Sequence, residues 1–212
     1  DPTAPPYSID VPVMVGYNRT EELVYYRSRP IDGDLDEAEL RARVAERLGE
    51  TSVSVDDVLA AYKEDHPQAS PWDRYMLICT DHPRGTYPQT LAVRREASGA
   101  APTYLYRFDW EIDEKLKSAH ALEIPFVFNT IHQPFSLFDI PENEETLALA
   151  KKMSHMWMAF ARTGKPNTAE MPDWPAYTAE SRHTMLFNNE SRVEKDPTPA
   201  TRKVMENVLG LA

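Results

Sequence analysis

The chain has 212 residues, 34 of them acidic and 23 basic, which gives a formal net charge of −11. This acidic balance argues against a protein that follows nucleic-acid phosphates or binds an anionic membrane surface. No apolar stretch is long enough to cross a bilayer. Cys79 is the sole cysteine, which excludes a disulfide within the chain and a cysteine-based zinc site.

The first half of the chain predicts one strand followed by helices. VPVMVG at 11–16 is continuously apolar and rich in β-branched residues, which is typical of a strand covered on both faces. LDEAELRARVAERLG at 35–49 places apolar residues four apart and ends in a capping glycine, which indicates a helix. Three further helices are predicted: one after the capping pair Ser54 and Asp57, one from Ser70-Pro71, and one over 86–98.

The second half predicts two more strands and two more helices. PTYLYRF at 102–108 alternates and is aromatic, and HTMLF at 183–187 is a third short strand. Residues 143–163 carry a methionine and aromatic stripe at helical spacing, which indicates core packing, and Thr198-Pro199 begins a final helix. Strands separated by helical crossovers predict an α/β domain with a parallel sheet. Three strands are too few for a complete sheet, so strand 11–16 is expected to lack a partner.

Two segments at the predicted carboxyl ends of strands are candidates for chemistry. Glu21 and Glu22 follow strand 11–16, although neighbouring acids in a loop are more often simply solvated. His120 lies twelve residues beyond strand 102–108, between two alanines, where a lone histidine is usually a surface residue. Among all six histidines no pair has the four-residue helical spacing of a metal site, so no metal or other cofactor is predicted. An acid after one strand and a histidine after the next follow the chain order acid, then His, of α/β hydrolases.

Three segments in this order resemble the type-B carboxylesterase family, which includes the cholinesterases. VPVMVGYNRTEE is similar to the family's strand with Gly-x-Asn-x-x-Glu, SAHALEIPFVF to its histidine segment, and MWMAFARTGKPN with DWPAY to a structural signature. The resemblance implies that Glu21 is the acid and His120 the base of a Ser-Glu-His triad. Glu22 stands where the family usually has glycine, and Glu123 is expected to tie the histidine loop by hydrogen bonds. We interpret the small residues beside His120 as room for its ring to reach a serine and an acid.

The family's nucleophile elbow, Gly-x-Ser-x-Gly, does not occur in the sequence, because no two of its seven glycines are four residues apart. Residues 1–212 are therefore expected to be the C-terminal part of an α/β hydrolase with an incomplete sheet. The resemblance implies a hydrolase of carboxylic esters whose serine and oxyanion hole come from an N-terminal part. This chain alone is expected to be inactive.

Further expectations concern partners and location. The implied partners are a carboxylic ester and the missing N-terminal part, with no nucleic acid and no membrane. Self-association is expected through the unpaired strand edge, with residues 199–209 as a candidate contact. A non-catalytic esterase-like binding or adhesion module and a free-standing interaction unit remain alternatives. The sequence favours neither a cytoplasmic nor a secreted location.

Overall fold

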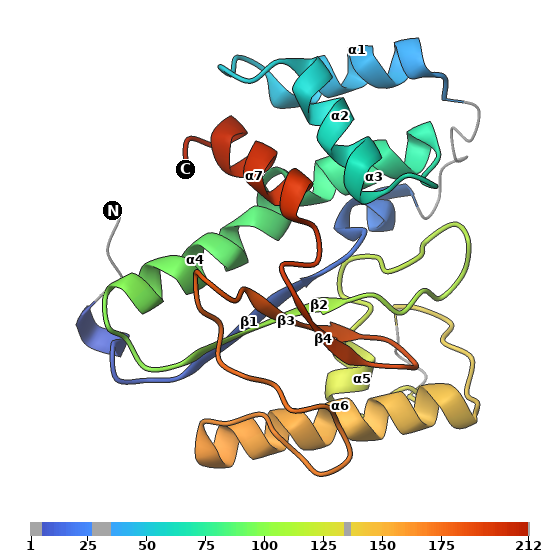
Figure 1. The fold of residues 1–212 in the computed structure, drawn as a ribbon. Coiled ribbons are helices and arrows are strands. Elements are labelled where there is room, and N and C mark those ends of the chain that lie inside the picture. The colour runs from blue at the N-terminus through green and yellow to red at the C-terminus, as the bar shows by residue number, and fades with distance from the viewer. Residues whose placement is uncertain (1–5, 27–34, 134–136, 212) are drawn as a thin grey trace.

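A computed structural model describes residues 6–26, 35–133 and 137–211 of the chain. At its centre is a four-stranded sheet with helices on both faces (Figure 1). In sheet order the strands are β1 (Val13–Asn18), β2 (Thr103–Phe108), β3 (His183–Phe187) and β4 (Arg192–Lys195).

The first three strands run parallel, and this part of the sheet confirms the predicted α/β class. β4 was not predicted, and it pairs antiparallel with β3, so the sheet is mixed rather than purely parallel. The segment RVEK gives no strand signal in the sequence, because it has only four residues, three of them charged, and is only partly buried. Its pairing depends on a tight return from β3, which local composition does not reveal.

Among the described strands β1 pairs only with β2, so it forms one edge of the sheet. Within this pair Gly16 lies opposite Tyr106. A Cβ atom at position 16 would overlap the ring and the carbonyl oxygen of Tyr106, so the close approach of the two strands requires glycine there.

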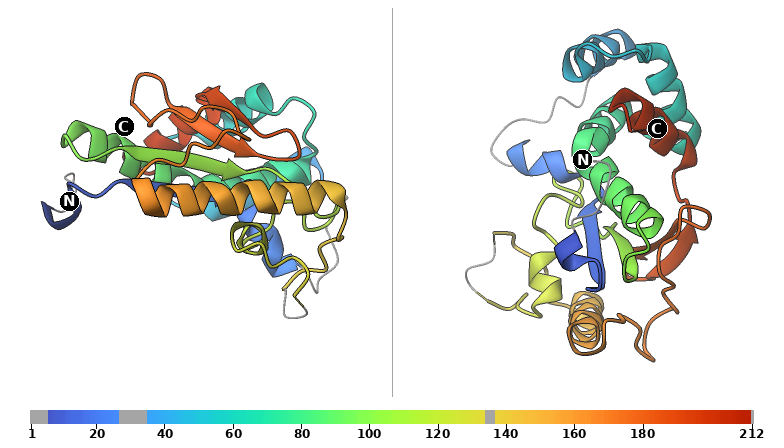
Figure 2. Two further views of the ribbon diagram at one scale, coloured as in Figure 1. Left: turned by 90° about the horizontal axis from the view of Figure 1, so that it is seen from below. Right: turned by 90° about the vertical axis from the view of Figure 1, so that its left-hand side faces the viewer.

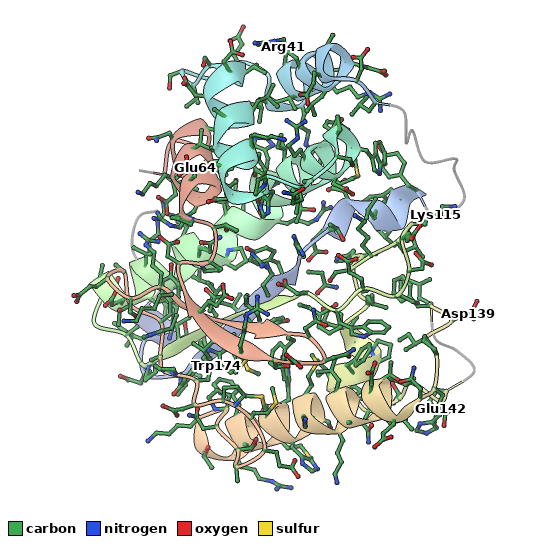
Figure 3. The ribbon with its side chains drawn as sticks, turned by 45° about the vertical axis from the view of Figure 1, so that its right-hand side comes forward. Arg41, Glu64, Lys115, Asp139, Glu142 and Trp174 are labelled. Carbon is green, nitrogen blue, oxygen red and sulfur yellow. The ribbon has the colours of Figure 1, made fainter. Side chains whose placement is uncertain are left out.

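The helix α6 (Glu144–Thr163) covers one face of the sheet, and its predicted apolar stripe provides the contact. The Trp157 ring packs edge-on against Tyr106 with centroids 5.2 Å apart. Trp174, from the segment after α6, lies between the sheet and α6 (Figure 3), where it is almost fully buried. The helix begins at an Asn143 capping box and ends at Gly164, which adopts the left-handed conformation.

The opposite face of the sheet is covered by α4 (Thr86–Ala97), and the side views show α4 and α6 on either side of the strands (Figure 2). A further helical layer lies beyond α4. It comprises α1 (Glu37–Leu48), α2 (Val55–Asp65), α3 (Pro71–Thr80) and α7 (Pro199–Val208). The predicted side-chain cap of Ser54 is present at the start of α2, and α3 begins at Pro71 as predicted, with Ser70 as an additional side-chain cap.

The last helix, α7, packs against α2. The backbone N–H of Thr201 donates to the Asp65 carboxylate at 2.7 Å, and the apolar residues Val204 and Met205 are buried within the chain. A contact between copies through residues 199–209 would therefore have to use the polar side of this helix.

Four short helical segments complete the described chain: η1 (Pro6–Ser8), η2 (Glu21–Tyr26), η3 (Asp81–Gly85) and α5 (Ile124–Val127). Each is too short to produce a readable apolar period, which is why none was predicted. Of the helices in the described ranges, none has the length and apolarity to span a membrane.

Candidate active site

The carboxyl ends of β1 and β2 lead directly into the two candidate segments. β1 continues into η2, and β2 continues into the loop that carries His120 (Figure 1). The two segments are joined by backbone hydrogen bonds: the N–H of Thr20 donates to Ser118 O at 3.1 Å, and the N–H of His120 donates to Glu21 O at 3.3 Å. These bonds bring the two segments side by side again after the excursion of residues 109–117, which follows β2.

Glu21 and His120 are in direct contact at this edge of the sheet. Oε2 of Glu21 lies 2.5 Å from Nδ1 of His120, and Oε1 accepts a hydrogen bond of 2.7 Å from the backbone N–H of Asn18. The Glu21 side chain is 8% exposed and that of His120 is 56% exposed. Both carboxylate oxygens are thus held, while the imidazole, whose Nδ1 meets Glu21, is largely exposed.

Asn18, the last residue of β1, links the strand to the histidine loop. Its Nδ2 donates to Ala119 O at 2.7 Å and to Oε2 of Glu123 at 2.7 Å, and the residue is 1% exposed. The sequence assigned no role to Asn18 beyond its place in Gly-x-Asn-x-x-Glu. That place in the pattern is the signal from which a role could have been inferred.

Glu123 lies at the other end of this hydrogen-bonded group. Burial raises the pKa of its carboxyl, the nearby charge of Glu21 adds to the rise, and the hydrogen bond from Asn18 opposes it. The expected tie between Glu123 and its surroundings is present as this hydrogen bond. Among the described residues, the Glu123 side chain hydrogen-bonds Asn18 and not the His120 ring, which fits an anchor of the loop.

Glu22, the second acid of the pair, points elsewhere. It forms ion pairs with Arg84 of η3 and Arg47 of α1 and does not contact His120. The two neighbouring acids therefore have different surroundings, although the sequence presents them together.

The residues around His120 are small for two different physical reasons. Ala119 is completely buried and packs in the core, so a larger side chain has no room. Ala121 has φ of 69°, a left-handed conformation that penalises β-branched side chains most. Ser118 is also fully buried, and its hydroxyl donates to Phe108 O at 2.5 Å. Backbone strain and burial, rather than room for the ring alone, account for this composition.

An apolar hollow of about 580 Å³ lies beside the histidine loop. Its walls include Ala121 from that loop, Ile124 and Pro125 from α5, and Leu137 and Phe138 from the chain beyond α5. None of the described residues that line it is charged. Such a surface is suited to an uncharged organic group rather than to an ion. Within the described ranges no cluster of three or more His, Cys, Asp or Glu side chains could hold a metal.

A mixed sheet of mainly parallel strands between helical layers, with a carboxylate and a histidine meeting at its carboxyl edge, defines a protein of the α/β-hydrolase class. The chain belongs to the carboxylesterase family, whose model matches residues 5–205.

Known esterases are similar to the chain in sequence and in structure. The para-nitrobenzyl esterase of Bacillus subtilis (strain 168) is 36% identical over 115 residues, which cover 53% of this chain and 23% of that protein. Human carboxylesterase 5A is 34% identical over 113 residues, covering 49% and 20%. A crystal structure of a Geobacillus stearothermophilus carboxylesterase superposes with a TM-score of 0.73 at 33% identity, covering 92% of this chain and 40% of that one. The chain thus spans well under half the length of these relatives.

Proposed function

We propose that this chain supplies the acid and the base of a Ser-Glu-His triad in a hydrolase of carboxylic esters. One observation supports the proposal most directly: the 2.5 Å contact between a buried Glu21 carboxylate and a largely exposed His120 imidazole. The membership of the chain in the carboxylesterase family supports the reaction class.

The proposed mechanism assigns each ring nitrogen of His120 a task. Glu21 accepts a hydrogen bond from Nδ1–H, which leaves the lone pair on Nε2 free to take a proton. Nε2 removes the proton of a serine hydroxyl as that oxygen attacks the ester carbonyl, and the acyl-enzyme forms when the protonated ring returns the proton to the departing alcohol. A water molecule then repeats the sequence and releases the acid. The Glu21 charge stabilises the imidazolium in both half-reactions.

The nucleophilic serine is proposed to come from another part of the protein. Ser118 is the hydroxyl nearest to His120 in sequence, but it is buried and donates to a backbone carbonyl. The chain also covers only 40% of the Geobacillus stearothermophilus esterase to which it is similar. We therefore propose that residues 1–212 are the C-terminal portion of the hydrolase domain and are inactive alone.

Hydrolysis of p-nitrophenyl esters by the full translation product of the gene tests the two assignments. His120→Ala and Glu21→Gln should each lower kcat by about three orders of magnitude or more, because triad members act as a unit. His155→Ala is the matched control, since His155 is an exposed histidine that also faces a glutamate, Glu170, at 3.3 Å. Equal activity of the His120 and His155 variants would refute the proposal.

The edge of β1 that no other described strand pairs with supports a proposal about partners. We propose that this edge receives the remaining part of the protein, and that the isolated chain self-associates through it. Isolated residues 1–212 should resist labelling by a serine-reactive fluorophosphonate and should elute larger than a monomer in light-scattering chromatography. Labelling would contradict the missing nucleophile, and a clean monomer at all concentrations would contradict the self-association.

A further inference from the structure

We propose that Glu22 is a positioning residue for Glu21: its ion pairs with Arg84 and Arg47 fix the short helix η2 that carries the acid. The proposal rests on the proposed function of Glu21 and His120. It concerns Glu22, which has no part in the triad mechanism but directly follows Glu21, which has.

The first anchor is Arg84 of η3, which contacts η2 at two places. Its Nη1 pairs with Oε1 of Glu22, and its Nη2 lies 3.3 Å from the hydroxyl of Tyr25. The guanidinium carbon also lies 5.9 Å from the centre of the Tyr25 ring. Residues three apart in a 3₁₀ helix lie on one side of it, so a single guanidinium can hold residues 22 and 25 together.

The second anchor is Arg47 of α1. Its Nη2 lies 3.7 Å from Oε1 of Glu22 and donates hydrogen bonds to Cys79 O at 3.0 Å and His82 O at 2.8 Å. Glu22 is thereby connected to α1, to the end of α3 and to η3 at one point. The helical layer and the acid-bearing segment share this junction.

The side chains of this junction are sufficiently shielded from water for their ion pairs to hold η2 in place. The Glu22 side chain is 14% exposed, Arg47 31% and Arg84 37%. Ion pairs between long, exposed side chains contribute little to stability. When a carboxylate is shielded from water and shared by two cations, removing one partner costs more stability. Glu21 contacts His120 instead, so the two neighbouring acids tie η2 to different parts of the molecule.

The consequence for catalysis is geometric. If the anchor is lost, η2 can move while the strand beneath it stays in place, and the Glu21 carboxylate no longer holds the imidazole in one orientation. Small misplacements of a catalytic group lower the rate far more than they lower substrate binding. Glu22 should therefore influence kcat more than KM.

The first experiment measures kcat and KM in the full translation product. Glu22→Gln and Arg84→Gln should each lower kcat by roughly tenfold with KM changed by less than about twofold. The double variant should be no slower than either single variant, and Arg84→Lys should recover part of the rate because it keeps the charge. Asp56→Asn is the matched control, because Asp56 pairs with Arg41 between α1 and α2 at an exposed site. A kcat of Glu22→Gln equal to that of the control would overturn the proposal.

A second experiment does not depend on activity. Hydrogen exchange of the same proteins should accelerate at residues 20–26 in Glu22→Gln and stay unchanged in Asp56→Asn. Nitrogen NMR of the His120 ring should show a fixed Nδ1–H tautomer in the parent and an averaged one in Glu22→Gln. If the parent hydrolyses no ester but both effects appear, the proposed function fails and the positioning role stands. If exchange and tautomer are unaffected by Glu22→Gln, the positioning role fails whatever the activity.

Discussion

Nδ2 of Asn18 lies 2.7 Å from Oε2 of Glu123, so the end of β1 and the loop before α5 share a hydrogen bond across 105 residues of sequence. The same amide nitrogen donates to Ala119 O, directly before His120. One buried side chain thus fixes the histidine loop at two points. Its backbone N–H holds the Glu21 carboxylate at the same time.

Asn18→Ala should lower the free energy of unfolding by about 2 to 3 kcal/mol. The substitution leaves a carboxylate and a carbonyl without their donor in a sheltered place, and such unmet groups cost more than an average hydrogen bond contributes. Urea denaturation measures the loss. Asn167→Ala removes an exposed amide that contacts Asp173 and serves as the control. Similar midpoint shifts for the two variants would show that the Asn18 contacts contribute little.

Ala121→Gly should stabilise the chain, or leave it unchanged, whereas Ala121→Val should destabilise it by at least about 1 kcal/mol. The residue has φ of 69°, where a Cβ is unfavourable and a β-branched side chain is worse. The gain for glycine is small because glycine also loses more entropy on folding. Ala42→Gly, in the exposed part of α1, should have the opposite sign and cost about 1 kcal/mol. Thermal unfolding of the three variants compares these signs.

Asp81→Asn should stabilise the folded chain more at pH 7 than at pH 4, when the variant is compared with the parent at the same pH. Burial raises the Asp81 pKa to about 6, although Tyr62 donates to it at 2.6 Å and Arg107 lies near. A carboxyl whose pKa is higher in the folded state contributes most to stability below its unfolded value and loses that contribution as the pH rises through 6. The asparagine oxygen can still accept from Tyr62 but carries no charge.

The expected advantage of Asp81→Asn at pH 7 is about 1 to 2 kcal/mol, less than the full shift implies because Asp81 as a residue is only partly buried. Denaturation of parent and variant at steps between pH 4 and 7 measures it. A difference that does not change with pH would mean that the Asp81 carboxyl is not the titrating group.

Trp174→Phe should cost far less than Trp174→Ala. The ring packs against Tyr104 and Phe187 with centroids 5.7 Å and 5.8 Å apart, so removing it leaves a cavity that costs about 3 to 5 kcal/mol. Its buried Nε1 has no hydrogen-bond partner in the described ranges, so phenylalanine gives up volume but no polar contact. Equal losses from the two substitutions, measured by urea denaturation, would contradict this account.

Local pattern was sufficient for most of the fold. The apolar spacing of Leu40, Val44 and Leu48 predicted the buried side of α1, and all three are buried. The start of α2 was predicted from the capping pair Ser54 and Asp57, and the start of α3 from proline at its first position, Pro71. β4 was not predicted, because this segment forms a strand through its hydrogen bonds with β3 and not through its own composition.

The sequence by itself determined the α/β class, the order of the main elements and the two residues, Glu21 and His120, on which the proposed chemistry depends. These follow from periodicity and spacing, which act over a few residues, and from the resemblance of short segments to a family. The tertiary structure decided where the second acid goes, since Glu21 contacts His120 while its neighbour Glu22 pairs with Arg84 and Arg47. It also revealed Asn18 as the link between two segments and Asp81 as a carboxyl with a raised pKa. Such contacts join residues far apart in the chain, and no local pattern encodes the environment that each side chain meets after folding.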